Sequence, residues 1–348
     1  MGLISDASGA ISGAISHVSG TLSSSVKFDT SSIPSQSGKV ILITGGKSFS
    51  LTSHPKSKPL TQIAGNVGLG RETCRVLAAH QPRHIYLCAR SAKKAETAIK
   101  ELKEAQPDAP LSFLPLDLAD LESVQACARA FVEKEDRLDL LVCNAGIMAV
   151  PEGLTKNGYE VQFGTNHLGH ALLVKLLLPV LERTMEVPGA DVRVVTVSSV
   201  GHHLAPQEGI EFAALKGEMG HLSTWNRYAQ SKLANRLFAS QLAERYPGIM
   251  SVSVHPGVVT TNLYDTFVGD AGLKKMAFWW YKQLLAVSVE EGSKNQLWAA
   301  TSPREGLVGG EYYFPIGILG KGSWQGADKE LGKKLWEWTE KELEGYTL

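Results

Sequence analysis

The chain has 348 residues, of which 43% are hydrophobic and 20% are charged, a composition typical of a globular protein with a sizeable core. Lysine plus arginine and aspartate plus glutamate each number 35, so the charge balance indicates no basic surface for nucleic acid. The four cysteines have no metal-ligand spacing and the ten histidines form no zinc motif. This pattern predicts buried thiols in a reducing compartment and no metal site.

The first residues, 1–37, are rich in serine, glycine and alanine. They predict a flexible N-terminal tail. Apolar residues also recur there at about helical spacing, so a weak amphipathic helix that contacts a membrane surface or a partner is the alternative. No stretch approaches the roughly 18 apolar residues of a membrane span, and no secretory signal is visible. The expected location is the cytoplasm, with peripheral membrane association as the alternative.

From residue 38 onward, apolar runs alternate with helical patterns. Runs such as LDLLVC and VRVVTV, without polar alternation, are typical of strands covered on both faces. Strands are expected at 39–44, 84–89, 111–116, 138–143, 192–198, 250–255 and 311–314. Helices are expected at 69–80, 92–105, 120–134, 160–182, 228–246 and 289–301. The alternation predicts one α/β domain over 38–348, a Rossmann-type doubly wound parallel sheet of about seven strands with helices on both faces.

The glycines on either side of an interruption are typical of a dinucleotide-binding turn between the first strand and its helix. Glycines let the backbone turn tightly against a pyrophosphate, and the helix N-terminus supplies N–H groups to it. With the interruption closed, the spacing is TGxxxGxG. The residues expected at this turn are Thr44, Gly45, Gly46, Gly68, Leu69 and Gly70.

Residues 47–65, the anomalous insertion within this turn, have two explanations. A real surface loop is tolerable, because each doubling of loop length costs only about 0.6 kcal/mol. The alternative is a translated intron: codons 46–48, 60–61 and 64–65 can carry donor, branch-point and acceptor patterns, and their excision keeps the frame. The order of these patterns favours the intron, in which case the spliced product would bind a cofactor better than the literal chain.

Two motifs in the second half of the chain carry hydroxyl and amine groups that could take part in proton transfer. YAQSK places Tyr228 and Lys232 on one face of a helix, four residues apart. A phenol titrates near 10, and a nearby ammonium would lower its pKa towards a range useful for proton transfer. Ser198 and Ser199 end a buried strand, where parallel sheets bind ligands.

Taken in order, these motifs resemble those of the short-chain dehydrogenase/reductase family, over about residues 38–260. TGxxxGxG with the interruption closed, NAG, the serine after the fifth strand, YxxxK and HPGVVTT occur in the family's order. The segments FGTNHLGHALL and VSSVGHH are most similar to the branch that contains retinol dehydrogenases and WW-domain oxidoreductase, with its fungal relatives in secondary metabolism.

The resemblance implies catalytic roles. Tyr228 would act as the general acid in ketone reduction and as the base in alcohol oxidation. Lys232 would lower the pKa of Tyr228 and bind the nicotinamide ribose. Ser199, rather than Ser198, would hold the substrate oxygen, and Asn166 would support a water that relays protons to Lys232.

It also implies a nicotinamide cofactor. Asn144 would contact the adenosine side, and Val259 and Thr261 would touch the carboxamide and pyrophosphate. Asp117 would accept from the adenine amino group, with an N-cap role as the alternative or an addition. Arg90 follows the second strand, and no acid stands there to select a free ribose hydroxyl. We therefore expect NADP, which cells hold mostly as NADPH, and hence reduction.

An aromatic run at 278–281 lies within an expected substrate lid around 264–290. Packing in the core or against a second subunit is the alternative for these rings. The expected substrate is an apolar small-molecule carbonyl or alcohol, and homo-oligomers occur in the family. A non-catalytic NADP-binding sensor or scaffold on the same fold is the competing function. The sequence identifies neither substrate nor pathway.

Overall fold

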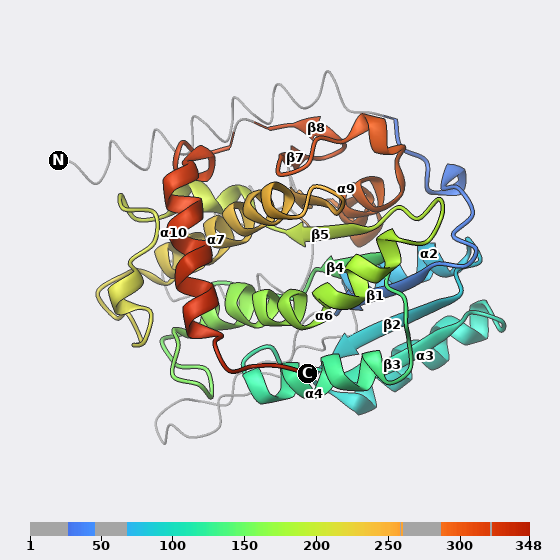
Figure 1. The fold of residues 1–348 in the computed structure, drawn as a ribbon, viewed down its shortest axis with the longest axis horizontal. Coiled ribbons are helices and arrows are strands. Elements are labelled where there is room, and N and C mark those ends of the chain that lie inside the picture. The colour runs from blue at the N-terminus through green and yellow to red at the C-terminus, as the bar shows by residue number, and fades with distance from the viewer. Residues whose placement is uncertain (1–26, 46–67, 258, 260–286, 321) are drawn as a thin grey trace, which may run out of the picture.

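The sheet is the centre of the molecule (Figure 1). The computed structural model describes residues 27–45, 68–257, 259, 287–320 and 322–348. Within them, eight strands form one sheet in the order β3-β2-β1-β4-β5-β6-β7-β8, parallel except for β8. The strands are β1 (Val40–Thr44), β2 (His84–Ala89), β3 (Leu111–Pro115), β4 (Leu140–Cys143), β5 (Arg193–Val197), β6 (Met250–Val254), β7 (Tyr312–Phe314) and β8 (Ile318–Leu319). The predicted doubly wound parallel fold is confirmed.

The eighth strand differs from the expected count of about seven. β8 runs antiparallel to β7 after a turn in which Gly317 has a φ of +67°. It has only two residues, too few for any hydrophobic period to reveal it.

Helices cover both faces of the sheet. Helices α2, α3 and α9 pack on one face and α4, α6 and α7 on the other, while α10 lies against α7 (Figure 1). The longer helices are α2 (Leu69–Ala78), α3 (Ala92–Ala105), α4 (Leu121–Val132), α6 (Gly169–Met185), α7 (Thr224–Arg245), α9 (Val289–Thr301) and α10 (Lys329–Glu342). The short helical segments are η1 (Thr30–Ser32), α5 (Val161–Phe163), η2 (Gly164–Leu168), η3 (Val200–Leu204), η4 (Phe212–Ala214), η6 (Arg304–Gly306) and η7 (Gln325–Ala327).

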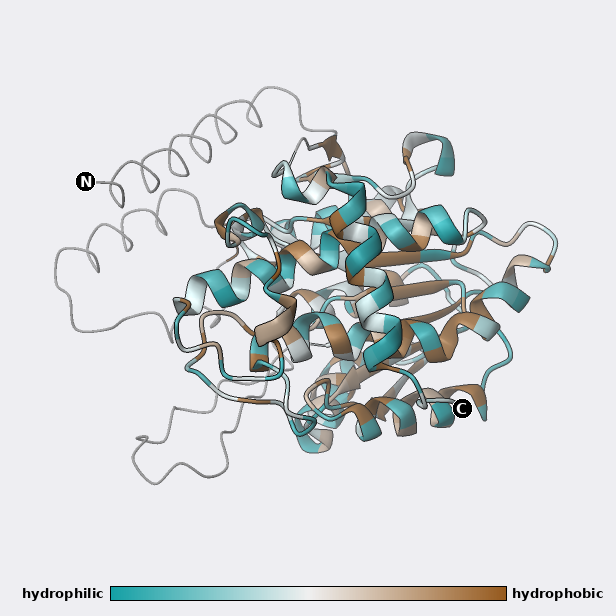
Figure 2. Ribbon diagram, turned by 60° about the vertical axis from the view of Figure 1, so that its left-hand side comes forward, coloured by the Kyte–Doolittle hydropathy of each residue, from teal (hydrophilic) through white to brown (hydrophobic). Residues whose placement is uncertain are grey.

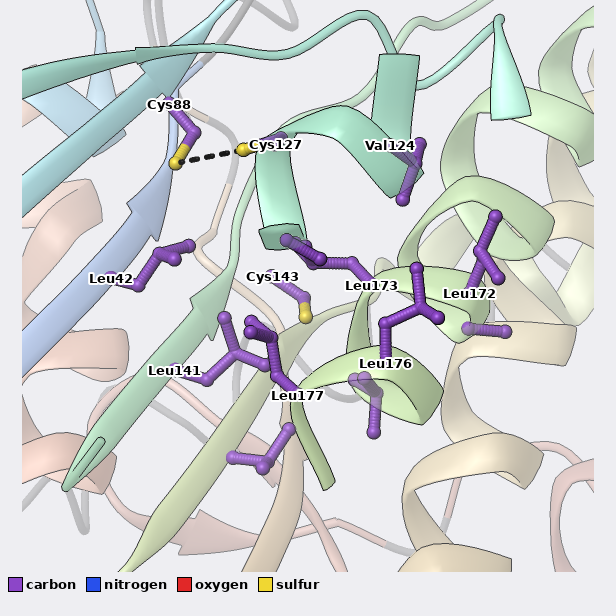
Figure 3. Packing of buried hydrophobic residues seen from close by; sticks show 14 of the residues in the cluster. Leu42, Cys88, Val124, Cys127, Leu141, Cys143, Leu172, Leu173, Leu176 and Leu177 are labelled. Carbon is purple, nitrogen blue, oxygen red and sulfur yellow. Dashed lines mark hydrogen bonds between the residues drawn. The ribbon is translucent and has the colours of Figure 1, made fainter. Parts of the chain in front are cut away.

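The core forms where helices meet strands. Figure 2 shows brown, apolar strands inside helices that carry teal residues on their outer turns. Leucines of α6, among them Leu173 and Leu177, pack towards Leu141 of β4 (Figure 3). Burial of each such side chain stabilises the fold by about 1.5–3 kcal/mol. The four cysteines are free and buried, as predicted, and the sulfurs of Cys88 and Cys127 lie 4.0 Å apart (Figure 3).

The end of the expected N-terminal tail is held against this body. Ile33 is buried in the cluster that contains β1 and β2. Gln36 is also buried, and its N–H donates to the carbonyl oxygen of His80 at 2.7 Å. The docked part of the chain therefore begins before the predicted boundary at residue 38. Among the described helices, none has both the length and the apolar character to cross a bilayer.

Candidate active site

The strand order reverses beside β1, which pairs with β2 on one side and β4 on the other. In an open parallel sheet, this arrangement leaves a crevice at the carboxyl ends of the strands, where ligands bind. Six of the residues predicted for catalysis or cofactor binding lie at or within two residues of those ends: Thr44, Gly45, Arg90, Asp117, Asn144 and Ser199.

The two halves of the glycine motif meet at this edge although the sequence separates them. A methyl group on Gly70 would lie 3.2 Å from the Cα of Gly45 and 2.7 Å from the amide nitrogen of Asn144. Gly68, the N-cap of α2, has a φ of +142°, which favours glycine, and no side chain caps it. The turn therefore fits the cradle that a pyrophosphate needs, with Leu69 as the first residue of α2. Gly46 and residues 47–65 lie outside the described residues, so the loop and intron explanations both stay predictions.

Thr44 holds β1 to the loop that follows β4. Its buried hydroxyl accepts the N–H groups of Asn144 and Ala145, both at 2.9 Å, and lies 2.9 Å from Nε2 of His170. The amide of Asn144 donates to the carbonyl oxygen of Thr44 at 2.8 Å. Both side chains thus fasten the NAG segment to the end of β1.

His170 continues this link to Asn166. Its Nδ1 lies 2.9 Å from the carbonyl oxygen of Asn166, which can only accept, so Nδ1 carries the proton. Nε2 is then the acceptor for the Thr44 hydroxyl. Burial lowers the pKa of His170 to about 4, which keeps the ring neutral at physiological pH.

The helix predicted over 160–182 is not uniform. Residues of η2, which include Asn166, have π-helical geometry between α5 and α6. The side chain of Asn166 accepts the N–H of Ile147 at 2.8 Å and donates to Ile147 O and Ser231 Oγ, both at 2.9 Å. Its oxygen keeps one further acceptor position. A wider turn in mid-helix is typical of functional sites, and here it carries a predicted site residue.

Tyr228 and Lys232 lie on α7, which begins at Thr224 rather than at the predicted residue 228. Lys232 Nζ lies 5.9 Å from the centre of the Tyr228 ring and donates to the carbonyl oxygen of Val197 at 2.9 Å. A methyl group on Gly146 would lie 3.0 Å from Asn166 Oδ1 and 3.3 Å from Lys232 Nζ. Both polar atoms therefore lie close to the same point beside Gly146, where the absence of a side chain leaves room for them.

Burial decides the acidity of this pair. Burial raises the pKa of Tyr228 to about 12, although a hydrogen bond with the Ser199 hydroxyl acts in the opposite direction and lowers this pKa. It also lowers the pKa of Lys232 to about 8. The expected lowering of the phenol pKa by the lysine is therefore not observed in the chain alone. The physical reason is that both groups are desolvated and the lysine donates to Val197.

The two adjacent serines have different partners. The hydroxyl of Ser198 donates to the carbonyl oxygen of Lys232 at 2.7 Å. The hydroxyl of Ser199 accepts the N–H of Gly201 at 3.0 Å and interacts with Tyr228. This geometry favours Ser199 over Ser198 for contact with a substrate oxygen.

The predicted adenosine end is more open. Arg90 NH1 and Asp117 Oδ2 lie 3.9 Å apart, with 28% and 33% of the side chains exposed. Asp117 accepts the N–H of Ala119 at 3.0 Å, but the N-cap of α4 is Asp120. The alternative N-cap role of Asp117 is therefore wrong, because the helix begins one turn later.

The remaining predicted residues follow β6 in the sequence. Val259 is buried and pairs with Val287 in a parallel bridge. Thr261 lies outside the described residues, as does most of the expected lid at 264–290. The last two residues of that range, Val289 and Glu290, begin α9.

Sequence reasoning missed three residues that orient the site: His170, His202 and Gly201. His202 donates from Nδ1 to the carbonyl oxygen of Ser199 at 2.6 Å. Gly201 leaves room for the Tyr228 ring, because a methyl group there would lie 3.1 Å from Tyr228 Cε1. His170 stands four residues after Asn166 in NHLGH, a spacing that could have pointed to it. For His202, the only signal in the sequence was the adjacent histidine pair HH, three residues after Ser199.

Comparison with known proteins gives consistent matches. The family model described as short chain dehydrogenase matches residues 62–270. A short-chain dehydrogenase/reductase of Armillaria gallica is 38% identical over 323 residues, which cover 92% of this chain and 95% of that protein. Retinol dehydrogenase 11 of Mus musculus is 36% identical over 280 residues, 78% of this chain and 82% of that protein.

Solved structures share the fold. A protein from Mycobacterium paratuberculosis has a TM-score of 0.65 at 29% identity, over 91% of this chain and 97% of its own. The NADPH-bound carbonyl reductase from chicken fatty liver has a TM-score of 0.57 at 20% identity, over 84% of this chain and 97% of its own. The second similarity concerns the architecture only.

Proposed function

The chain belongs to the short-chain dehydrogenase/reductase family, in its retinol dehydrogenase-like branch, and from that premise we propose that it is an NADP-dependent oxidoreductase. It would reduce the ketone or aldehyde of an apolar small molecule, or oxidise the alcohol, in the cytoplasm and as part of secondary metabolism. The observation that carries the proposal is the meeting of Ser199, Tyr228 and Lys232 at the carboxyl edge of β5, next to Asn166.

The chain's own groups would handle the proton. NADPH, when bound, supplies the hydride. The hydroxyl of Ser199 would hold the carbonyl oxygen, and Tyr228 would donate its proton to that oxygen. Burial lowers the pKa of Lys232 to about 8. Because this pKa lies near physiological pH, the ammonium could return a proton towards Tyr228. Asn166, which lies beside Gly146 together with Lys232, would hold the water that resupplies it.

NADP rather than NAD is supported by the adenosine end. Arg90 is half-buried, and its 3.9 Å separation from Asp117 leaves its donors available to a 2′-phosphate. Planar guanidinium groups bind such phosphates with two parallel hydrogen bonds.

An apolar substrate is supported by the surroundings of the phenol. Tyr228 shares a buried cluster with Met148 and Ala149, and Trp225 packs against it with its ring centre 6.1 Å from that of Tyr228. A carbonyl compound that reaches the Tyr228 hydroxyl would therefore meet apolar side chains on this side. Sites of this kind favour compounds that carry one polar group on an apolar body.

The test begins with the transcript. Sequencing across codons 46–65 identifies the chain that the cell makes. The forms with and without residues 47–65 are then both expressed and assayed for the oxidation of NADPH and NADH with apolar ketones and aldehydes. We expect turnover with NADPH at a KM at least about tenfold below that for NADH. Tight NADPH binding with no turnover of any carbonyl would contradict the proposal and support the sensor.

A further inference from the structure

His202 is a buried histidine that none of the proposed proton steps uses. It lies in η3, directly after Ser199 and Gly201, and is 0% exposed. Its Nδ1 lies 2.6 Å from the carbonyl oxygen of Ser199. Its Nε2 lies 3.0 Å from the backbone nitrogen of Ser323 and 3.4 Å from NH1 of Arg236.

These partners fix the protonation of the ring. A carbonyl oxygen only accepts, so Nδ1 must carry a proton towards Ser199. The Ser323 N–H and the Arg236 guanidinium only donate, so Nε2 must be the acceptor. Burial, followed by the nearby His203 and Arg236, lowers the pKa of His202 well below its usual value. The ring is therefore a neutral Nδ1–H imidazole with both nitrogens in use.

Packing fixes the direction of the ring. His203 stacks on it with ring centres 4.5 Å apart, and the ring of Tyr312 of β7 lies perpendicular to it with ring centres 5.0 Å apart. Arg236 lies one helical turn after Lys232 on α7 and fits against Gly322 and Gly326, where an added methyl group would overlap its guanidinium. The segment after β8 thus closes over His202 and Arg236 together.

The turn that His202 holds contacts the reacting groups. The N–H of Gly201 donates to Ser199 Oγ at 3.0 Å, and the backbone of Gly201 lies against the Tyr228 ring. A shift of this turn would therefore move the serine hydroxyl and loosen the contact with the phenol. Ser199 O accepts both the backbone N–H of His202 at 3.1 Å and the ring Nδ1–H at 2.6 Å. The ring, through its other nitrogen, links this turn to Ser323 in the C-terminal segment.

We propose that His202 is a positioning residue, which sets the Ser199 hydroxyl relative to Tyr228 and couples that geometry to the segment around Ser323. The inference deepens the proposed function and rests on it for its kinetic consequence. His202 exchanges no proton in the reaction. Its effect is on orientation, for which displacements of about 1 Å can cost on the order of a hundredfold in rate.

Two conservative variants separate the bonds of the ring. Asparagine places an amide nitrogen where Nδ1 stands, so His202→Asn keeps the donor to Ser199 and loses the acceptor for Ser323. Glutamine places its amide oxygen where Nε2 stands, so His202→Gln keeps the acceptor and loses the donor. His202→Asn loses the bond from Ser323 and the 3.4 Å contact with Arg236, whereas His202→Gln loses only the bond to Ser199. The asparagine variant should therefore lose at least as much stability in thermal unfolding as the glutamine variant.

The rates should differ. We expect His202→Asn to keep kcat within about threefold of the wild type and His202→Gln to lose about ten- to hundredfold, with the KM for NADPH unchanged in both. A role in stability alone would lower kcat in the asparagine variant at least as much as in the glutamine variant. Equal kcat values, or a slower asparagine variant, would overturn the proposal.

A second measurement does not depend on turnover. Long-range ¹H–¹⁵N spectra of the full chain report which nitrogen of each histidine carries the proton, and the His202→Asn variant assigns the signal. A neutral Nδ1–H ring that does not titrate between pH 5.5 and 8 is expected, and an Nε2–H ring or a titration in that range would overturn the inference. A wild type with this ring that binds NADPH and reduces no carbonyl would refute only the proposed function.

Discussion

The two ends of the candidate site differ in how their polar groups are held. At the catalytic end, Tyr228, Lys232 and Asn166 are 5%, 4% and 0% exposed. At the adenosine end, about a third of the side chain of Arg90 or Asp117 is exposed, and the two charges are 3.9 Å apart. Groups proposed to exchange protons are shielded from water, whereas groups proposed to bind the cofactor stay open to it. Substitutions should therefore separate rate from cofactor affinity.

Neutral histidines account for part of the order at the catalytic end. His170 donates from Nδ1 to the carbonyl oxygen of Asn166, and His202 does the same to Ser199. Their other nitrogens accept from Thr44 and Ser323. Each ring thus ties the backbone of a proposed site residue to a distant segment, and among the described residues no comparable link holds Arg90.

The largest effect should come from Tyr228→Phe. The change removes the proposed proton donor and keeps the ring that packs on Gly201, so kcat should fall about 10²- to 10⁴-fold. Affinity for NADPH, measured by fluorescence titration, should stay within about twofold. A Tyr228→Phe protein with wild-type turnover would show that the buried end does not carry the chemistry.

A pH titration of stability can sharpen the contrast between the ends. Burial lowers the pKa of Lys232 from 10.5 to about 8, so between those values the unfolded chain binds more protons than the native one. Stability from this group therefore rises with pH. The unfolding free energy of the wild type relative to Lys232→Met should increase by about 2 kcal/mol from pH 8 to pH 10.

The matched control for this titration is Arg90→Met at the open end. A guanidinium stays charged throughout that range, so the difference between wild type and Arg90→Met should be flat from pH 8 to pH 10. Urea unfolding at the two pH values measures both differences. A flat difference for Lys232→Met would mean that the amine is solvated in solution.

Arg90→Ala should produce the reverse of the Tyr228 result. The loss of charge-assisted hydrogen bonds to a 2′-phosphate should raise the KM for NADPH about tenfold, leave that for NADH unchanged, and change kcat little. Steady-state assays with both cofactors measure this. If the KM for NADPH and the KM for NADH rise equally, Arg90 contacts a part of the cofactor that NADPH and NADH share, and not the 2′-phosphate.

The sequence predicted the features that depend on local pattern. Unbroken apolar runs such as LDLLVC indicated buried parallel strands, and ordered motifs located Ser199, Tyr228 and Lys232 on the correct elements. Closing the interruption in TGxxxGxG anticipated that Gly70 lies against Gly45. These inferences succeed because strand burial and turn geometry depend on residues that are close together in the sequence.

Features that depend on distant partners could not be predicted. The π-helical turn at Asn166 lies inside the segment predicted as one helix, and the side chain of Asn166 there bonds to Ile147 and Ser231, which lie elsewhere in the chain. The contact between His202 and Ser323 joins residues far apart in the chain. The pKa of Tyr228 was expected to fall because its neighbour Lys232 was known, but the degree of burial was not, and burial dominates.

The smallest effect that still distinguishes the two ends should come from Gly201→Ala. The added methyl group would lie 3.1 Å from Tyr228 Cε1 and 3.3 Å from Ser199 Oγ, closer than ordinary contacts, so the turn must shift by a few tenths of an ångström. Because the reacting groups must stay aligned, we expect kcat to fall about fivefold, with the KM for NADPH unchanged. Gly306→Ala is the matched control, since nothing lies within 4 Å of a methyl group there and its kcat should equal that of the wild type. An unchanged kcat in Gly201→Ala would mean that the buried end tolerates displacement as well as the open end does.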